Sequence, residues 1–331
     1  MKNKKAQMEE SIHWVFVLIA GSVILLVFGT FIYKAKFSAE KEASVDLVND
    51  LSLIFTGSEI SSKTVNKIDD MPDIPIEFDC DELTIGTTRL GYNSKIVFAP
   101  KESKSNTMLV WSYDWKAPFF VTNFIYISNP DTKYYFVYDQ LDAESKQMKE
   151  EFQELMPEFF KYDFLNRVQL IALKHPGFKN IRFIFLNYFD TSKHTLHNTF
   201  RGQSYSGIFL GKNGELNYLV PKQDGFDAKS NTADAYYLDT ASMLGALFSQ
   251  DKELYTCSMG RALKRHKILS GLLEARSVKI DAATDACLYP TGLFDLTTAT
   301  VSSVPTAFNA KLTTLKNANE LLQKKSCPLL Y

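Results

Sequence analysis

The pattern of apolar and polar positions divides the chain into three parts. Residues 14–33 are an unbroken run of twenty uncharged, mostly apolar residues, and a helix of that length spans ~30 Å, the thickness of a membrane's hydrocarbon layer. Short apolar runs separated by turn residues then predict strands up to about residue 238. From residue 239 onward, apolar residues recur at helical spacing and predict a mainly helical C-terminal region, residues 239–331.

The apolar run is predicted to be a transmembrane helix with bounds at residues 13–33. It begins at Trp14 and ends at Tyr33, whose amphipathic rings favour the boundary between membrane and water. The alternative is a buried core helix, which would need a large protein around it because the run is apolar on every side. Gly21 and Gly29 permit close backbone approach to a partner helix.

Charges on either side of the span predict its direction. Lys2, Lys4 and Lys5 cluster before it, whereas the lysines that follow are mixed with glutamates. Residues 1–12 are therefore expected to be a leader-like segment in the cytoplasm. No second stretch of spanning length follows, so we expect a single-pass protein of the cell membrane whose bulk is extracytoplasmic.

The helical pattern continues beyond the span. Residues 34–56 contain neither Pro nor Gly, and they are predicted to be an amphipathic extension of the same helix. The apolar stripe that should pack on the folded domain consists of Leu47, Val48, Leu51, Ile54 and Phe55. Residues 57–76 are polar and contain Pro72 and Pro75, so they are predicted to be a hinge.

Residues 77–238 are predicted to be an extracytoplasmic α/β region. Helices are expected over residues 142–156, 251–280 and 305–325. The first of these lies between strands, and this order indicates at least one crossover unit, with an α+β arrangement as the alternative. The predicted strands occupy residues 83–86, 95–99, 107–113, 119–127, 134–138, 168–173 and 181–186, followed by a hairpin of 206–210 and 215–220 around an Asn-Gly turn.

Four cysteines, all beyond the span, lie too far apart in sequence for a CxxC motif. They predict two disulfides in an oxidising compartment, with free buried thiols as the alternative. If the last helix folds back antiparallel on its predecessor, Cys327 arrives beside Cys257. We therefore predict the pairs Cys257–Cys327 and Cys80–Cys287.

Lys4-Lys5-Ala6-Gln7, followed by the apolar helix, resembles the start of archaeal type IV pilin-like proteins with a class III signal peptide. The resemblance covers about residues 1–55. It implies that a prepilin-type peptidase cuts between Ala6 and Gln7, and that the helix contacts membrane lipid, further copies of the chain or other pilin-like subunits. Ser11 stands where many pilins carry Glu, which counts against a long filament. An uncleaved signal anchor is the alternative.

No constellation of residues indicates catalysis. The sequence 202–207 departs by one residue from the nucleophile elbow GxSxG, and a strand follows where a helix is required. His194 and His197, with Asp190, lack the helical alignment of a metal-binding pair and are expected in a surface loop. Neither a Walker motif nor GxGxxG is present. We therefore expect no enzymatic activity, no bound metal and no cofactor.

Charged and aromatic clusters complete the sequence picture. The acidic residues between 69 and 82 lack the spacing of an EF-hand and are expected to form a solvated turn. The basic run from Arg261 to Lys267 is expected to be a solvated helix face, because a net charge of −1 argues against nucleic acid as a partner. Alternation along strands predicts a core position for about half of the aromatic residues between Trp111 and Phe120, a sugar-binding surface being the alternative.

Together these patterns predict a membrane-anchored cell-surface protein. One function is that of a pilin-like or structural subunit of a surface assembly, whose working part is the membrane helix. The alternative is a monomeric anchored protein whose outer domain recognises a ligand. A hydrophobic content of 45% and a charged content of 23% agree with an ordinary globular domain beyond the anchor.

Overall fold

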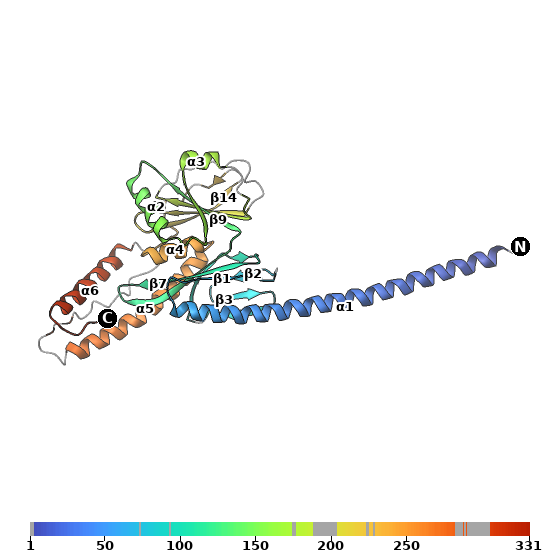
Figure 1. Cartoon of the computed structure of the whole chain (residues 1–331), viewed down its shortest axis with the longest axis horizontal. Helices are drawn as coiled ribbons and strands as arrows, with labels where there is room; N and C mark the ends of the chain where they lie inside the picture. The colour runs from blue at the N-terminus through green and yellow to red at the C-terminus, as the bar shows by residue number, and fades with distance from the viewer. Residues whose placement is uncertain are drawn as a thin grey trace.

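A computed structural model describes residues 3–72, 74–92, 94–173, 177–187, 204–222, 225–227, 229–281, 287, 289 and 305–331, with side chains from residue 14 onward. One long N-terminal helix projects from a body of sheets and helices (Figure 1). The predicted fold class is confirmed: a long apolar helix, a strand-rich α/β region and a helical C-terminal region follow one another along the chain.

The elements have the following bounds. The helices are α1 (Asn3–Ile60), α2 (Ala143–Leu155), α3 (Arg167–Ala172), α4 (Thr240–Phe248), α5 (Lys252–Asp281) and α6 (Thr306–Lys324). The earlier strands are β1 (Val65–Ile68), β2 (Ile76–Phe78), β3 (Glu82–Ile85), β4 (Thr88–Gly91), β5 (Ile96–Phe98), β6 (Glu102–Ser103), β7 (Met108–Lys116) and β8 (Phe120–Ser128). The later strands are β9 (Thr132–Tyr138), β10 (Lys161–Asn166), β11 (Asn180–Leu186), β12 (Ser204–Leu210), β13 (Glu215–Leu219), β14 (Pro221–Lys222), β15 (Gly225–Phe226) and β16 (Ala235–Tyr236).

Helix α1 is continuous for 58 residues. It runs past its predicted end because Nδ2 of Asn123 donates hydrogen bonds to the carbonyl oxygens of Ser58 and Glu59, at 3.2 and 3.0 Å, and these acceptors have no partner within the helix. Residues 14–42 are almost entirely exposed. The predicted amphipathic extension is confirmed, because a stripe at helical spacing is buried against the body: Ser44, Leu47, Leu51, Phe55 and Ser58.

The predicted hinge at residues 57–76 is wrong. Helix α1 occupies its first residues, and β1 pairs antiparallel with β7 in the central sheet. β1 is an edge strand, so it can carry exposed polar residues such as Lys67. The polar composition therefore marks the edge of a sheet instead of a linker.

The central sheet has the strand order β1-β7-β8-β5. Successive residues of β8 point to opposite faces, as the pleat of a strand requires. Phe124 and Tyr126 enter a core that α4 and α5 cover, whereas Ile125 and Ile127 enter a second core that α1 covers. A smaller sheet, β4-β3-β2-β6, completes this second core and packs on the end of α1.

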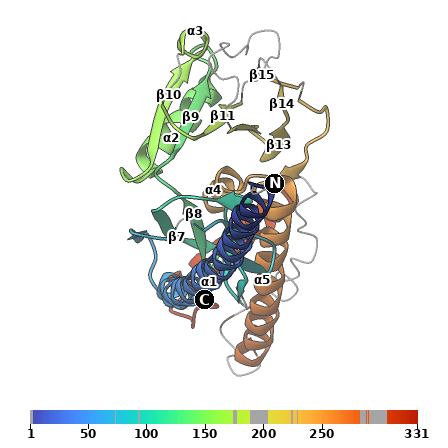
Figure 2. The same cartoon turned by 90° about the vertical axis from the view of Figure 1, so that its right-hand side faces the viewer.

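The largest sheet has the order β10-β9-β11-β12-β13-β16, and its first four strands are parallel. Figure 2 shows its strands β10, β9 and β11 apart from β7 and β8 of the central sheet. α2 connects β9 to β10, so the predicted crossover unit is confirmed. A strand predicted over residues 168–173 is wrong, because this segment forms α3. Asn166 begins that helix with a capping box to Gln169, which turns the chain out of β10.

Helices α5 and α6 confirm the predicted helices over 251–280 and 305–325, but not their predicted antiparallel arrangement. The ring of Phe308 at the start of α6 lies 5.6 Å from the ring of His266 in the middle of α5. Beyond the end of α6, the carbonyl oxygen of Leu330 accepts a hydrogen bond of 3.3 Å from Arg276, one turn before α5 ends. The two helices therefore run in the same general direction.

Candidate functional site

Both disulfides differ from the predicted pairs. Cys80 is bonded to Cys257, with Cα atoms 5.8 Å apart, and Cys287 to Cys327, with Cα atoms 6.0 Å apart. The prediction assumed that α6 returns antiparallel along α5. Because α6 instead runs in the direction of α5, its C-terminal end lies near the end of α5, and Cys327 meets Cys287 there.

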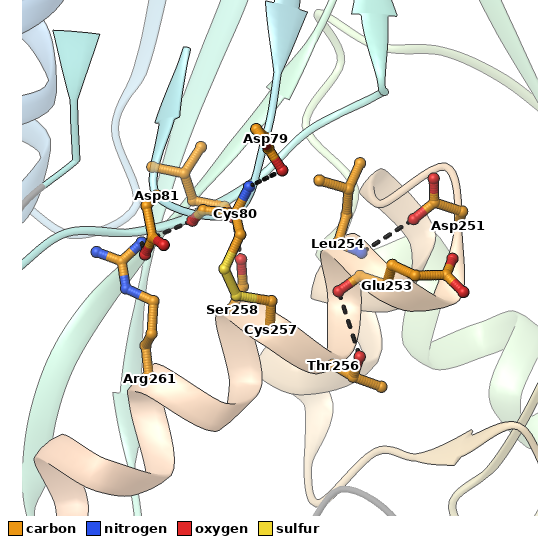
Figure 3. Close-up of a disulfide and its surroundings, with 11 residues drawn as sticks. Asp79, Cys80, Asp81, Asp251, Glu253, Leu254, Thr256, Cys257, Ser258 and Arg261 are labelled. Atoms are coloured by element: carbon orange, nitrogen blue, oxygen red, sulfur yellow. Dashed lines mark hydrogen bonds and ion pairs between the residues drawn. A yellow bond between two sulfur atoms is a disulfide. The ribbon is translucent and has the colours of Figure 1, made fainter.

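The Cys80–Cys257 disulfide joins the turn between β2 and β3 to the first turns of α5 (Figure 3). Around it, Nη1 of Arg261 donates a 2.8 Å hydrogen bond to the carbonyl oxygen of Cys80 and lies 3.7 Å from a carboxylate oxygen of Asp81. Ser258 donates a 2.6 Å hydrogen bond to the carbonyl oxygen of Val97 in β5. These contacts hold α5 against two sheets at once.

Part of α1 is a candidate membrane span. The structure has one described helix that is long and apolar enough to cross a membrane, and the apolar window of that helix is not buried in the body. Trp14 and Tyr33 at its ends are 68% and 71% exposed. A Cβ atom added to Gly21 or Gly29 would meet no neighbour within 4 Å. Ala6 and Gln7 lie in the first part of α1, where side chains are outside the described residues, so the processing site stays a prediction.

A cavity of about 620 Å³ lies where the amino-terminal ends of the parallel strands meet the central sheet. Such clefts between structural layers are the usual places for small-molecule sites. β9, β11 and β12 contribute residues on one side, the end of β8 and the β5–β7 connection on the other, and the α4–α5 junction closes the back. The lining residues that matter below are Glu102, Lys104, Ser128, Tyr134, Lys179, Arg182 and Ser206.

Arg182 is the charged residue at the back of this cavity, and it is only 5% exposed. Burial lowers the pKa of its guanidinium group from the ordinary value. Nη1 donates to Oγ of Ser206 at 3.0 Å. The remaining donors reach the carboxyl end of α4, whose carbonyl groups carry a partial negative charge: the acceptors are the carbonyl oxygens of Ala246, Leu247, Ser249 and Gln250.

The five guanidinium donors of Arg182 are thus all used, and their acceptors among the described residues are carbonyl and hydroxyl oxygens. Sequence reasoning missed this residue. The only available signal was a single charge inside the otherwise apolar segment 181–186. A charge in a buried strand needs partners, and the end of a helix supplies them.

Two buried hydroxyl groups line the same cavity. Oγ of Ser128 and the phenolic oxygen of Tyr134 lie 2.6 Å apart, and the two residues are 2% and 4% exposed. Burial raises the pKa of Tyr134 to about 12, so its hydroxyl is protonated at neutral pH. Beside them, Nδ2 of Asn129 donates to Oγ of Ser103 at 3.1 Å, and Thr132 donates to its Oδ1 at 3.0 Å.

The opposite, carboxyl ends of the parallel strands also gather polar groups. Nδ2 of Asn187 donates to carboxylate oxygens of Asp142 and Glu144, both at 3.0 Å, and Nζ of Lys212 lies 3.6 Å from Glu144. In sheets of this kind, ligands often bind where the strand order reverses, here between β9 and β11. At this edge the described side chains bond to one another, so the cavity at the other end is the stronger candidate site.

The other sequence candidates are dispersed. Ser204 and Ser206 lie in strand β12, so the segment 202–207 does not form the strand-to-helix turn of a nucleophile elbow. His194, His197 and Asp190 lie outside the described residues. Of the acidic residues between 69 and 82, Glu77 lies in β2 and Glu82 in β3, and the other described ones lie in the connections next to these strands. The described residues include no group of three potential metal ligands.

The basic run on α5 is a solvated face only in part: Lys264 and Lys267 are exposed, as the sequence predicted, whereas Arg265 and His266 are not. Nη1 of Arg265 lies 3.0 Å from Oε1 of Glu59, and His266 is 2% exposed. Both residues face the body because α5 packs on the central sheet. The prediction for the aromatic residues is confirmed, since Trp111, Trp115 and Phe119 are buried whereas Phe120 is half exposed.

Comparisons with protein families, with curated proteins and with solved structures find no match for this chain. Its function is therefore inferred from its own residues and their geometry.

Proposed function

We propose that the protein is a single-pass, membrane-anchored cell-surface protein, a pilin-like or structural subunit of a surface assembly. In this proposal the N-terminus is cytoplasmic and the folded body lies outside. The observation that carries it is the continuity of α1, which joins an exposed apolar segment to a stripe buried in the body. A helix without a break fixes the body rigidly to the membrane.

Helical geometry supports a body that sits close to the lipid. Tyr33 ends the apolar run, and Ser44 is the first residue of α1 that is buried in the body. Ser44 lies eleven positions after Tyr33, which corresponds to a rise of ~16 Å along an α-helix. The intervening segment carries Lys34, Lys36 and Lys41, whose charges suit the headgroup layer.

The disulfides support the outward placement of the body. All four cysteines are paired. Disulfides persist in oxidising compartments and are rare where thiols are kept reduced. Protease added to sealed cells should therefore degrade the body while residues 1–12 stay protected. Protection of the body until the membrane is broken would contradict the proposed topology.

Exposed apolar residues of α1 beyond the span support an assembly role. Phe37, Val45 and Leu53 lie beyond the span and are 49%, 41% and 72% exposed. These three side chains point in different directions around the helix, so neighbouring subunits packed around this segment would remove them from water. Membrane lipid and further copies of the chain, or related subunits, are the partners that this surface fits.

The processing step gives a direct test of the pilin-like assignment. Mass spectrometry of the mature protein should show Gln7 as its first residue. Ala6→Phe should block the cut, because the peptidase of the archaeal pilin-like family cuts after a small residue. Ala39→Phe, in the exposed part of α1 beyond the span, is the control and should leave the cut unchanged. An intact Met1 in the wild-type protein would remove the pilin-like assignment and leave an uncleaved anchor.

The cavity favours the second candidate function, an anchored extracytoplasmic binding protein. Its volume of about 620 Å³ lies within the range of small-molecule sites, and its lining mixes charged groups with hydroxyl and amide groups. A structural subunit has no need of such a site. Binding of a small ligand by the full chain is the observation that would support this function.

A further inference from the structure

We propose that two copies of the chain associate through unlike helix faces: the acidic face of α1 beyond the span in one copy packs on the outer face of α5 in the next. The inference rests on the first candidate function, a subunit of a surface assembly, and names the contact that joins its subunits. Opposite charge, exposed apolar side chains and a matching spacing of residues lead to it.

One face of α1 beyond the span carries three carboxylates. Glu42, Asp46 and Asp50 follow one another at four-residue spacing, so they share one side of the helix, and all three are exposed. Like charges at this spacing repel one another, and none of the three has an ion pair with a residue that the structure describes. Leu53 lies on the same face and is 72% exposed. A cationic and partly apolar partner surface would therefore stabilise this face.

The outer face of α5 has the opposite charge. Lys264 and Lys267 are exposed, and neither forms an ion pair within the described part of the chain. Ile268 and Leu272 are 66% and 63% exposed. A Cβ atom added to Gly271 would meet no neighbour within 4 Å, so a partner helix can approach the backbone closely at this position. This face thus offers both a cationic and an apolar contact to an acidic helix.

The two faces have matching spacing. Asp46 precedes Leu53 by seven positions, and Lys264 precedes Gly271 by the same number. Seven residues make almost two helical turns, so each pair lies along one side of its helix. Two helices packed side by side in the same direction can place Asp46 beside Lys264. The same alignment places Leu53 over Gly271, where the partner helix leaves room for a side chain.

The direction of the helices agrees with this alignment. Figure 1 shows α1 and α5 leading toward the same side of the molecule, away from the N-terminus. Copies that share one orientation would therefore bring the two helices together in the same general direction. The alignment also brings Asp50 beside Lys267, which gives the contact a second pair of opposite charges.

The contact joins unlike levels of the two copies. Arg265 pairs with Glu59 near the end of α1, whereas Asp50 lies nine positions before Glu59, a rise of ~14 Å along the helix. The copy that contributes α1 therefore stands farther out than the copy that contributes α5. Each copy keeps its other face available, so this heterologous contact repeats into an open array. The span of the outer copy is displaced by the same amount, which an array that leaves the lipid permits.

Formation of mixed disulfides by the full chain in detergent tests the contact, because detergent does not hold two spans at one level. The structure has no free cysteine among the described residues, so an added thiol reports on its own neighbours. Copies with Leu53→Cys are mixed with copies with Gly271→Cys and oxidised at low salt. We expect a dimer linked between positions 53 and 271, identified by peptide mapping. Lys146→Cys on the exposed face of α2 is the control and should give no dimer with Leu53→Cys.

Charge reversal tests the pairing of carboxylates with lysines. Asp46→Lys together with Asp50→Lys, in the copy with the thiol on α1, should lower the yield of the mixed dimer at least about fivefold. Lys264→Glu together with Lys267→Glu, in the copy with the thiol on α5, should then restore the yield because the signs are exchanged. A salt concentration of about 1 M should weaken the contact between copies of native charge by screening. An unchanged yield after the first reversal would overturn the proposed pairing.

The remaining outcomes separate this inference from the function on which it rests. Dimers linked between two copies at position 53, or at position 271, would show that like faces meet. That result overturns the inference and leaves an assembly function in place, as would oligomers detected by light scattering without the mixed linkage. A monomeric mass for the native chain together with failure of all three linkages would remove both.

Discussion

Oε1 of Glu59 lies 3.0 Å from Nη1 of Arg265, and this ion pair joins the last turn of α1 to the middle of α5. The two residues are separated by more than 200 positions in the chain. The contact therefore connects the anchor helix directly with the C-terminal region. Any rigidity between membrane and body depends on contacts of this kind, together with the buried stripe of α1.

The Glu59–Arg265 pair should contribute a modest and measurable coupling to stability. Their side chains are 24% and 35% exposed, so solvent screens part of the attraction. A double-mutant cycle with Glu59→Gln and Arg265→Met should give a coupling free energy of about 0.5–1 kcal/mol in denaturant unfolding of the full chain in detergent. The Lys36–Glu40 pair, which is mostly exposed on the free part of α1, should show no coupling in the same assay.

The disulfide pairs should differ in their effect on stability. Cys80 and Cys257 are 177 positions apart in sequence, and Cys287 and Cys327 are 40 apart. The longer loop loses more chain entropy when it is closed, which favours the first disulfide by about 1 kcal/mol. Replacing each pair by serines and comparing the free energies of unfolding tests this. Peptide mapping without reductant must recover the same pairs; a peptide joining Cys257 to Cys327 would contradict the assignment.

The sequence predicted those helices and strands in which the spacing of apolar residues matches the residues that are buried. Apolar spacing on α1 located Leu47, Leu51 and Phe55 on the buried face, and the apolar runs located strands such as β7 and β8. The segment after Lys161 was harder, because β10 is an edge strand with few buried residues and α3 is short. Edges and short helices depend on tertiary neighbours that a sequence pattern does not contain.

The cavity and the cysteine pairing depended on long-range geometry. To predict the cysteine pairs, one must know whether α6 runs parallel or antiparallel to α5. The long segment between the two helices allows either direction, so the sequence does not decide it. To predict the cavity, one must know how the two sheets are placed relative to each other. Its lining residues come from distant segments of the chain, such as those of Lys104 and Ser206. Only Arg182 carried a local signal, as a charge in an apolar strand.

Replacing either of two helical glycines by alanine should change the stability of the protein, with opposite signs at the two positions. A Cβ atom on Gly245 in α4 would lie 2.7 Å from the ring of Phe98, which is fully buried, so Gly245→Ala should destabilise the protein by about 1–3 kcal/mol. A Cβ atom on Gly271 in α5 meets nothing within 4 Å. Gly271→Ala should therefore stabilise it by about 0.5–1 kcal/mol, because alanine has less backbone freedom to lose. Thermal unfolding of both variants tests the sign; equal shifts would contradict the packing of α4.

Replacement of Arg182 should be strongly destabilising even by lysine. Arg182→Lys keeps the charge, but an ammonium group lacks the planar set of donors that reaches the end of α4, so several buried carbonyl groups lose their partner. The expected loss is about 3 kcal/mol or more. Arg89→Met, at an exposed pair with Glu82, should change the stability by less than about 0.5 kcal/mol. Similar effects of the two replacements in urea unfolding would rule out the capping role of Arg182.

Stability should fall in mild acid because of His266. Its ring is buried and parallel to the ring of Phe119, and its Nε2 hydrogen is donated to the carbonyl oxygen of Ala117. Burial lowers the pKa of His266 below its ordinary value of 6.5, and the hydrogen bond offsets this only in part. The unfolded chain therefore binds a proton at a higher pH than the folded protein does. The contribution of His266 to the free energy of unfolding is therefore fully present above pH 6.5. It is lost as the pH falls from 6.5 through the lowered pKa of His266 in the folded protein.

His266→Gln isolates this contribution, because glutamine can donate to the same carbonyl oxygen but does not titrate. Asp239 has the opposite tendency, since burial raises its pKa above 3.8, and its effect cancels when the variant is compared with the wild type. The free energy of unfolding should be measured from pH 8 to pH 5 for both proteins. The wild type should lose more stability than the variant as the pH falls below 6.5. Parallel curves would show that His266 is not held neutral by its surroundings.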